Sequence, residues 1–152
     1  MLLRSVVLIL LCSACGGTPI AFEADCGLLV EEGEFNATPE DIISCQRAAV
    51  KHQLTTCDLM QGVHLQFLAT PTWTDSYGRE VSGLTFFPGS LHPLDTFTTI
   101  QVGPLPAYYG AFIHELHHLG AMLDTDNQNH VGWENGTYLE IDLARTDARA
   151  AQ

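Results

Sequence analysis

Apolar residues fall at every second position over 63–69, a period typical of a strand with one buried face. Other short segments combine apolar and β-branched residues between turn signals. They are residues 27–32, 80–88 and 97–103. The pattern therefore predicts a small sheet.

A helical period of apolar residues begins at residue 39. Thr38 suits the N-cap, Pro39 suits the first helical position, and Asp41 stands where a capping acid belongs. The apolar stripe of the predicted helix 39–56 consists of Ile42, Cys45, Ala49 and Val50 or Gln53.

Two further helices are predicted in the second half of the chain. Pro104 and Pro106 interrupt the preceding strand pattern and open a helix that runs to about Leu123. A last helix starts at Thr137, with Glu140 three residues on in a capping-box arrangement. The segment between these helices is polar and rich in turn residues, so it predicts a loop.

Length and charge narrow the possible functions. The chain has 152 residues, of which 46% are hydrophobic and 16% charged, as is typical of one folded domain. Eighteen acidic residues against six basic ones give a formal net charge of −12. This balance opposes nucleic-acid binding, which needs Lys and Arg at phosphates, and electrostatic attraction to anionic lipids. We expect no nucleic-acid partner, and the acidity serves solubility.

The first residues have the pattern of a targeting segment: Arg4 supplies a positive charge, and a short apolar core and small residues follow. The apolar core is too short to remain as a membrane span. Residues 13–16, Ser-Ala-Cys-Gly, resemble the lipobox of bacterial lipoproteins, with Cys12 where leucine is usual. The resemblance implies a signal peptide over 1–14, lipidation of Cys15 and a lipid anchor in the membrane of the cell envelope.

The rest of the chain divides into a tether over 15–25 and one folded domain over 26–152. Whether it is lipid-anchored or simply secreted, the mature protein leaves the cytoplasm and enters an oxidising compartment. One disulfide is therefore expected among Cys26, Cys45 and Cys57. Cys45 and Cys57 lie too far apart along or beside one helix to bridge. Cys26 is therefore expected to be one half of the disulfide, and the other half is either Cys45 or Cys57.

The segment HELHH, residues 114–118, carries the candidate chemistry. His114 and His118 are four residues apart, so on a helix both imidazoles lie on one face and can reach a single ion. Glu115 stands beside them and completes an H-E-x-x-H arrangement. The opposite side of the helix has an apolar stripe made of Phe112, Leu116, Leu119 and Leu123. The two histidines therefore point into a cleft or the solvent.

A catalytic zinc site needs three protein ligands and one open position. His130 lies twelve residues beyond His118, past the turn-rich loop, and we favour it as the third ligand. Asp124 and Glu134 are the alternatives. The expected metal ligands are thus His114, His118 and His130.

Residues 114–118, followed by a loop and His130-Val-Gly-Trp, resemble the zincin metallopeptidases, most closely small members with a downstream third histidine. The order of a helix and a mixed sheet ahead of the active-site helix is similar too, which implies an α+β fold of minimal zincin type with a C-terminal helix. Ala121 departs from the metzincin pattern, which has glycine there, and we find no Met-turn. The resemblance implies one zinc ion, a peptide or protein substrate, and Glu115 as the general base that activates a zinc-bound water.

The remaining candidates support such a site. By resemblance an edge strand beside the cleft holds extended substrate, and residues 98–103 are the candidate. His117 is expected to point off the metal face, and Trp133 is expected to fix the loop that carries His130. A peptidase site also needs a group that stabilises the oxyanion, and the candidates are Tyr108, Tyr109 and Tyr138. The alternative role for each of them is packing. No role is assigned to His52, His64 and His92.

Two other functions stay open beside the peptidase. One is a non-catalytic lipoprotein of the same fold that binds zinc or a partner. The other is an envelope interaction module in which HELHH holds no metal. Zinc content separates the last from the first two, and the activity of a Glu115→Gln variant separates the peptidase from the zinc-binding protein.

Overall fold

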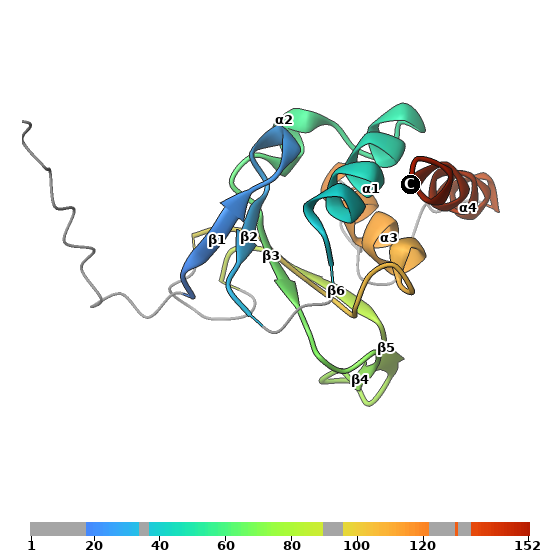
Figure 1. Cartoon of the computed structure of the whole chain (residues 1–152). Coiled ribbons are helices and arrows are strands. Elements are labelled where there is room, and N and C mark those ends of the chain that lie inside the picture. Colours follow the sequence, from blue (N-terminus) through green and yellow to red (C-terminus); the bar gives the residue numbers. More distant parts are fainter. Residues whose placement is uncertain (1–17, 34–36, 90–95, 122–129, 131–134) are drawn as a thin grey trace, which may run out of the picture.

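The computed structural model describes residues 18–33, 37–89, 96–121, 130 and 135–152. Its architecture is α+β, as predicted, with a five-stranded mixed sheet, a small hairpin and helices (Figure 1). The strands are β1 Ile20–Glu23, β2 Leu29–Glu31, β3 His64–Phe67, β4 Trp73–Thr74, β5 Glu80–Val81, β6 Gly83–Phe86 and β7 Thr99–Val102. The helices are η1 Asp25–Gly27 (a 3-10 turn), α1 Pro39–Lys51, α2 Cys57–Met60, α3 Tyr109–Gly120 and α4 Asn135–Ala150.

The main sheet has the strand order β1-β2-β3-β7-β6. Strands β2, β3 and β7 are parallel, and the outer strands β1 and β6 are antiparallel to their neighbours. The expectation that residues 98–103 form the edge strand is wrong, because β6 pairs along the whole of β7, from Gly83 opposite Val102 to Phe86 opposite Thr99. Within the described residues, β6 is the edge strand that contacts α3.

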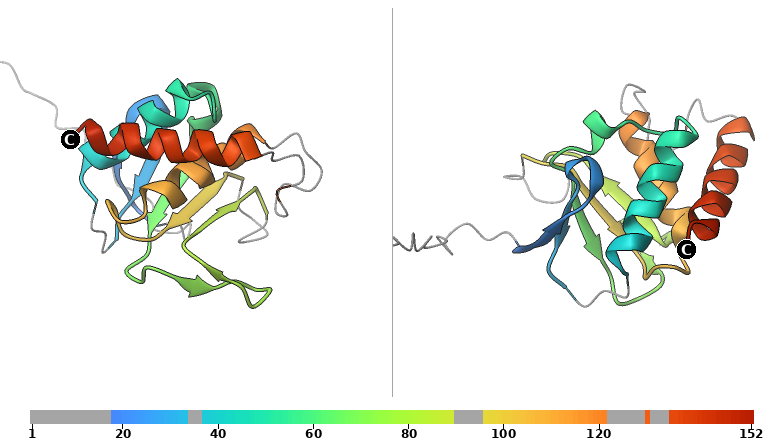
Figure 2. Two further views of the ribbon diagram at one scale, coloured as in Figure 1. Left: turned by 90° about the vertical axis from the view of Figure 1, so that its right-hand side faces the viewer. Right: turned by 45° about the horizontal axis from the view of Figure 1, so that its top comes forward.

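The segment 80–88, expected to be a single strand, divides into two. Its first part, β5, pairs with β4 in a separate hairpin, and β6 enters the main sheet directly after Ser82. The tip is stabilised by Asp75 Oδ1, which accepts hydrogen bonds from the backbone N–H groups of Tyr77 and Arg79. The hairpin projects from the body of the fold (Figures 1 and 2).

Helix α1 begins where the sequence predicts. The Asp41 N–H donates to Thr38 Oγ1 at 3.2 Å, and the Thr38 N–H donates to Asp41 Oδ2 at 2.9 Å, which forms a capping box. The helix ends at Lys51 rather than at residue 56, because Gln53 adopts a left-handed backbone with φ 57° and turns the chain. The predicted stripe is fully buried at Ile42, Cys45 and Ala49.

Helices α1 and α3 lie between the sheet and α4 (Figure 2). The sheet contributes Val30, Leu65 and Ile100 to the core, all fully buried. Helix α4 adds Ile141, Ala144 and Ala148. Thr137 lies inside α4 and is not its N-cap, because Asn135 and Gly136 already belong to the helix.

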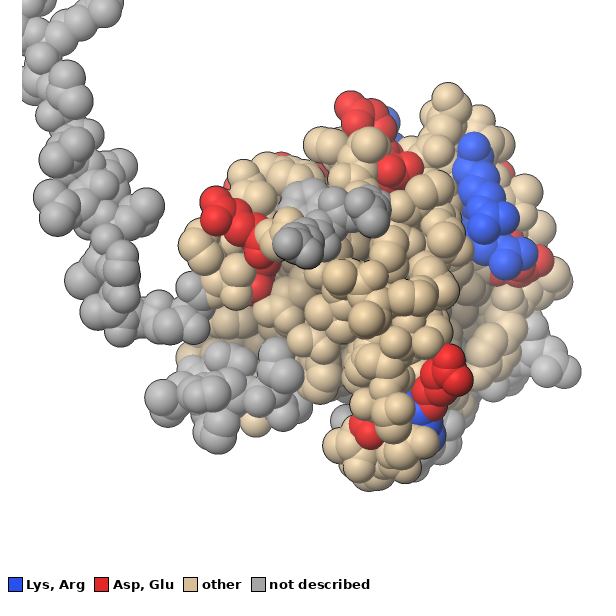
Figure 3. Space-filling model, turned by 60° about the horizontal axis from the view of Figure 1, so that its bottom comes forward, with Lys and Arg blue, Asp and Glu red and all other residues tan. Residues whose placement is uncertain are grey.

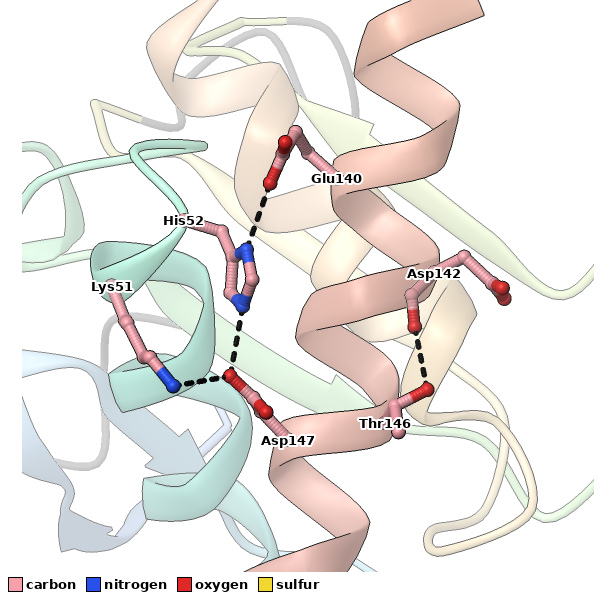
Figure 4. A network of polar contacts seen from close by, with 6 residues as sticks. All are labelled: Lys51, His52, Glu140, Asp142, Thr146 and Asp147. Atoms are coloured by element: carbon pink, nitrogen blue, oxygen red, sulfur yellow. Dashed lines mark hydrogen bonds and ion pairs between the residues drawn. The ribbon is translucent and has the colours of Figure 1, made fainter.

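A polar network joins α4 to the end of α1 (Figure 4). His52, the C-cap of α1, lies between two carboxylates, with Nδ1 2.8 Å from Glu140 Oε2 and Nε2 2.9 Å from Asp147 Oδ2. Lys51 Nζ donates to the same Asp147 oxygen at 2.6 Å. The two acids are seven residues apart, about two turns of one helix face, so they bracket the imidazole ring.

One disulfide joins Cys26 to Cys57, whose Cα atoms are 4.7 Å apart. The expectation that Cys26 is a partner is confirmed, and Cys45 is a buried free thiol. Burial raises the pKa of the Cys45 thiol, so this side chain stays protonated. The bridge closes a sequence separation of 31 residues, which stabilises the fold by about 3–4 kcal/mol in the chain-entropy account. A disulfide is consistent with a location outside the cytoplasm.

The N-terminal part of the chain is described from residue 18, so the predicted signal peptide and Cys15 lie outside the described residues. Residues 20–23, expected in the tether, form β1, because their backbone groups pair with the free edge of β2. The sheet thus begins before residue 26, the expected start of the domain. In the described ranges, no helix is both long and apolar enough to cross a membrane.

Candidate metal centre

Helix α3 presents two faces of different chemistry. The face toward the core consists of Phe112, Leu116 and Leu119, each at most 1% exposed, as predicted. The helix begins three residues after Pro106 rather than at the prolines, and it ends at Gly120, with Ala121 as its C-cap, before the expected end at about Leu123. His114 and His118 lie along a cavity on another side of the helix.

Three histidines converge at this cavity. His114 Nε2 lies 3.2 Å from His118 Nε2 and 2.9 Å from His130 Nε2. The three ligand atoms lie within 4.8 Å of one another. Tetrahedral ligands about 2.1 Å from a zinc ion are about 3.4 Å apart, so small adjustments of the three rings would admit one ion. The structure thus contains a three-histidine group that could hold a metal ion.

His130 enters the group through an uncommon backbone conformation. Its φ of 58° lies in the left-handed region, which few residues other than glycine adopt. Such strain persists only where the surrounding structure holds it, and it clusters at functional sites. The sequence favoured His130 as the third member, and the structure brings it to His114 and His118. The alternatives and the expected loop anchor lie outside the described residues; they are Asp124, Glu134 and Trp133.

Glu115 lies beside the histidines and is only 5% exposed. Its Oε2 accepts a hydrogen bond from the Thr85 hydroxyl at 2.8 Å and lies 4.0 Å from His118 Nε2. Burial raises the pKa of Glu115 to about 8, and the hydrogen bond from Thr85 acts in the opposite direction. A carboxyl group in this position can hold or release a proton near neutral pH.

Strand β6 makes room for Glu115 at Gly83. A Cβ atom added to Gly83 would lie 2.8 Å from both Cγ and Oε1 of Glu115, closer than any ordinary contact. No pattern in the sequence singled out Gly83 or Thr85 as part of the site. A glycine inside a predicted strand is a known signal for a close approach by another group, and it could have identified Gly83.

The three-histidine group favours neutral imidazoles. Burial and, to a smaller extent, the neighbouring His118 and His130 lower the pKa of His114 to about 3. Burial also lowers the pKa of His130, with a smaller effect from Arg79. Neutral imidazole is the form that coordinates a metal, so protons compete little with an ion at His114 and His130.

His117 points off the metal face, as predicted. Its Nδ1 donates to the backbone oxygen of Leu54 at 2.8 Å, which ties the HELHH turn to the segment after α1. Gly120 packs against the same carbonyl, since a Cβ there would lie 2.8 Å from it. His117 therefore contributes to the position of α3 rather than to the metal group.

None of the other candidates within the described residues lines the cavity beside the three histidines. Tyr109 is fully buried, and its hydroxyl donates to Asp41. Neither Tyr108 nor Tyr138 is among the described residues that line the cavity. His64 Nδ1 lies 2.7 Å from Glu31 Oε1, and its ring stacks on Phe97. His52 belongs to the network with α4, and His92 lies outside the described residues.

The cavity has a volume of about 550 Å³. It is bordered by His114, Glu115, His118 and His130 on one side, and by β6 and the β4–β5 hairpin on the other. Comparisons of the chain with protein-family models, with curated proteins and with solved structures found no match.

Proposed function

We propose that this protein is a zinc-dependent peptidase of the cell envelope. The observation that carries the proposal is the convergence of three imidazoles beside a buried carboxyl group at the wall of a cavity. Three histidine ligands with one open coordination position are typical of catalytic zinc sites. The resemblance of residues 114–118 and His130 to zincin metallopeptidases adds peptide hydrolysis.

A zinc ion at this group would supply Lewis acidity, which polarises the substrate carbonyl and makes water more acidic. His114, His118 and His130 would hold the ion through their Nε2 atoms. Glu115 takes a proton from the attacking water and delivers it to the amine nitrogen as the C–N bond breaks. The products are a carboxylic acid, which receives the hydroxyl group of the water, and an amine, which receives its proton.

Extended substrate would pair with the edge of β6. This strand follows the hairpin directly, borders the cavity and contacts α3. Backbone hydrogen bonds to an edge strand bind a peptide without regard to its sequence. The partners are therefore a peptide or protein substrate and, through lipidated Cys15, the membrane.

A zinc-binding protein without catalytic activity is the second candidate. The observation that favours it concerns the oxyanion: none of Tyr108, Tyr109 and Tyr138 is among the described residues that line the cavity. Removal of a single oxyanion donor lowers turnover by about 10²–10³-fold, so a site without one would turn over slowly.

A Glu115→Gln variant tests the proposal and separates the two candidates. We expect about one zinc ion per chain in both wild-type protein and the variant, measured by elemental analysis after loading at neutral pH. Peptide hydrolysis should fall by about 10²–10⁴-fold in the variant, because the proton acceptor is removed while the ligands remain. Hydrolysis that survives the change would show that Glu115 is not the general base.

A further inference from the structure

The cavity beside the three histidines has two walls of different chemistry. Helix α3 provides the polar wall, with His114, Glu115 and His118. The second wall comes from the β4–β5 hairpin, β6 and the residue after it, and it combines apolar side chains with polar or charged ones such as Asp75, Arg79 and Glu80. Its apolar and aromatic residues are Trp73, Tyr77, Val81, Leu84, Phe86 and Phe87. Apolar and aromatic side chains beside convergent polar groups are typical of a small-ligand pocket, and about 550 Å³ is an ordinary volume for one.

The charges of the hairpin are already paired within it. Arg79 forms an ion pair with Asp75 at 2.8 Å, and the Asp75 side chain is only 3% exposed. The Arg79 guanidinium also lies 5.2 Å from the centre of the Tyr77 ring. Glu80 accepts a hydrogen bond from the Thr72 hydroxyl at 2.8 Å. A charged side chain of a ligand would therefore have to displace existing contacts.

The apolar side chains of this wall are only partly covered. Trp73 and Val81 stand opposite each other in the β4–β5 pair, and both are half-buried. Figure 3 looks onto the side from which the hairpin projects, where uncharged side chains predominate and acidic and basic ones also lie on the projecting part. An apolar side chain that covers Trp73 and Val81 would remove further apolar surface from water, which favours binding.

We infer that the β4–β5 hairpin sets the specificity of the site, and that the substrate presents a bulky apolar side chain next to the cleaved bond. This inference rests on the proposed peptidase function. The reacting carbonyl lies at the three histidines, and the neighbouring side chain meets the wall formed by Trp73 and Val81. The hairpin is thus a specificity element rather than part of the catalytic group.

The test uses the purified full-length protein loaded with zinc and a peptide library obtained by digestion of a whole proteome. Mass spectrometry identifies the bonds that are cut. We expect Leu, Phe and Met to exceed Asp and Lys by more than about tenfold at one position next to the cleaved bond, because one apolar pocket discriminates by about 10–200-fold. Cleavage without such a preference overturns the inference while the peptidase function stands.

Variants at Val81 locate the preference. Val81→Asp should reduce it by roughly tenfold, and the nearly isosteric Val81→Thr should reduce it less. The matched control is Leu139→Asp, because Leu139 is 59% exposed on α4 and does not line the cavity. An unchanged cleavage profile in both Val81 variants overturns the role of the hairpin. If the zinc-loaded wild-type protein cuts no peptide in the library, the proposed function fails, and the inference fails with it.

Discussion

Two histidine clusters in this protein differ in what surrounds the rings. At the metal centre, His114 meets His118 and His130, and burial together with these neighbours lowers the pKa of His114 to about 3. At the α1–α4 contact, His52 lies between Asp147 and Glu140, and these two acids raise its pKa. The first environment favours neutral rings, and the second favours an imidazolium ion.

The difference shows how to separate a ligand histidine from a structural one. An imidazolium ion between two carboxylates donates both N–H groups and has no lone pair left for a metal. Neutral rings whose Nε2 atoms face one another have lone pairs that a cation can share. The protonation state that each site favours thus follows from its surroundings: burial is the main cause at His114, and the two carboxylates are the main cause at His52.

The largest effect is expected for the loss of a ligand. His114→Ala should reduce bound zinc from about one ion per chain to none, because two histidines remain where a stable site needs three. His52→Ala is the control, and it should keep the full zinc content, since His52 lies in the α1–α4 network. Elemental analysis of the two variants measures both results. Zinc retained in His114→Ala would reject the metal centre.

Zinc removal should be the next largest effect. A ligand at about 1,000 times its Kd stabilises the folded state by about 4 kcal/mol, and chelation removes that contribution. We expect the Tm to fall by roughly ten degrees or more on addition of a chelator, because about 1 kcal/mol corresponds to roughly 2–8 degrees for a domain of this size. The shift should be equal in wild-type protein and His52→Ala, and absent in His114→Ala. A Tm unaffected by chelation in wild-type protein would contradict a folded-state zinc site.

The sequence was sufficient for features that depend on local spacing. The positions of His114 and His118 on one helix follow from their separation of four residues, and the start of α1 follows from Thr38 and Asp41. His130 was favoured because it follows the turn-rich loop and because Ala121 stands where the metzincin pattern has glycine, and the structure brings it to the other two. Local patterns therefore identified the central residues of the candidate site.

Features set by distant contacts were missed or misplaced. The order of strands depends on which segments pair, so the sequence placed β7 at the edge where β6 lies. Thr85 and Glu115 are thirty residues apart, and no periodicity links them. The mate of Cys26 was equally open, because Cys57 and Cys45 are both compatible with the chain until η1 and α2 are brought together.

A substitution beside Glu115 should reduce activity while zinc stays bound. In Gly83→Ala, the added Cβ would lie 2.8 Å from Glu115 and would displace its carboxyl group. A displacement of about 1 Å lowers the rate by about 10²-fold. Gly33→Ala is the control, because a Cβ there meets nothing within 4 Å. The measurement is kcat/KM on a peptide that the wild-type protein cuts, together with zinc content. Equal activity in both variants would contradict the placement of Glu115.

The smallest expected effect is the change with pH of the stability that His52 contributes to the folded protein. Because the folded-state pKa of His52 is raised above its ordinary value of 6.5, its stabilisation is complete below pH 6.5 and is lost as the pH rises through the folded pKa. The lowered pKa of His114 acts oppositely: the unfolded chain binds more protons than the folded protein between about pH 3 and 6.5, so stability rises as the pH rises through that range.

His52→Gln should therefore destabilise the protein by about 1 kcal/mol near pH 6 and by much less at high pH, since partly exposed ion pairs of this kind contribute about 0.2–1 kcal/mol each. Thermal unfolding of wild-type protein and variant between pH 5.5 and 9, with chelator present so that zinc does not enter, gives the difference. The control is Arg47→Gln, which removes an exposed ion pair with Asp25, because arginine stays charged throughout this range. A difference that stays constant with pH in His52→Gln would mean that His52 is neutral in the folded protein, and the contrast between the two clusters would then rest on packing and not on charge.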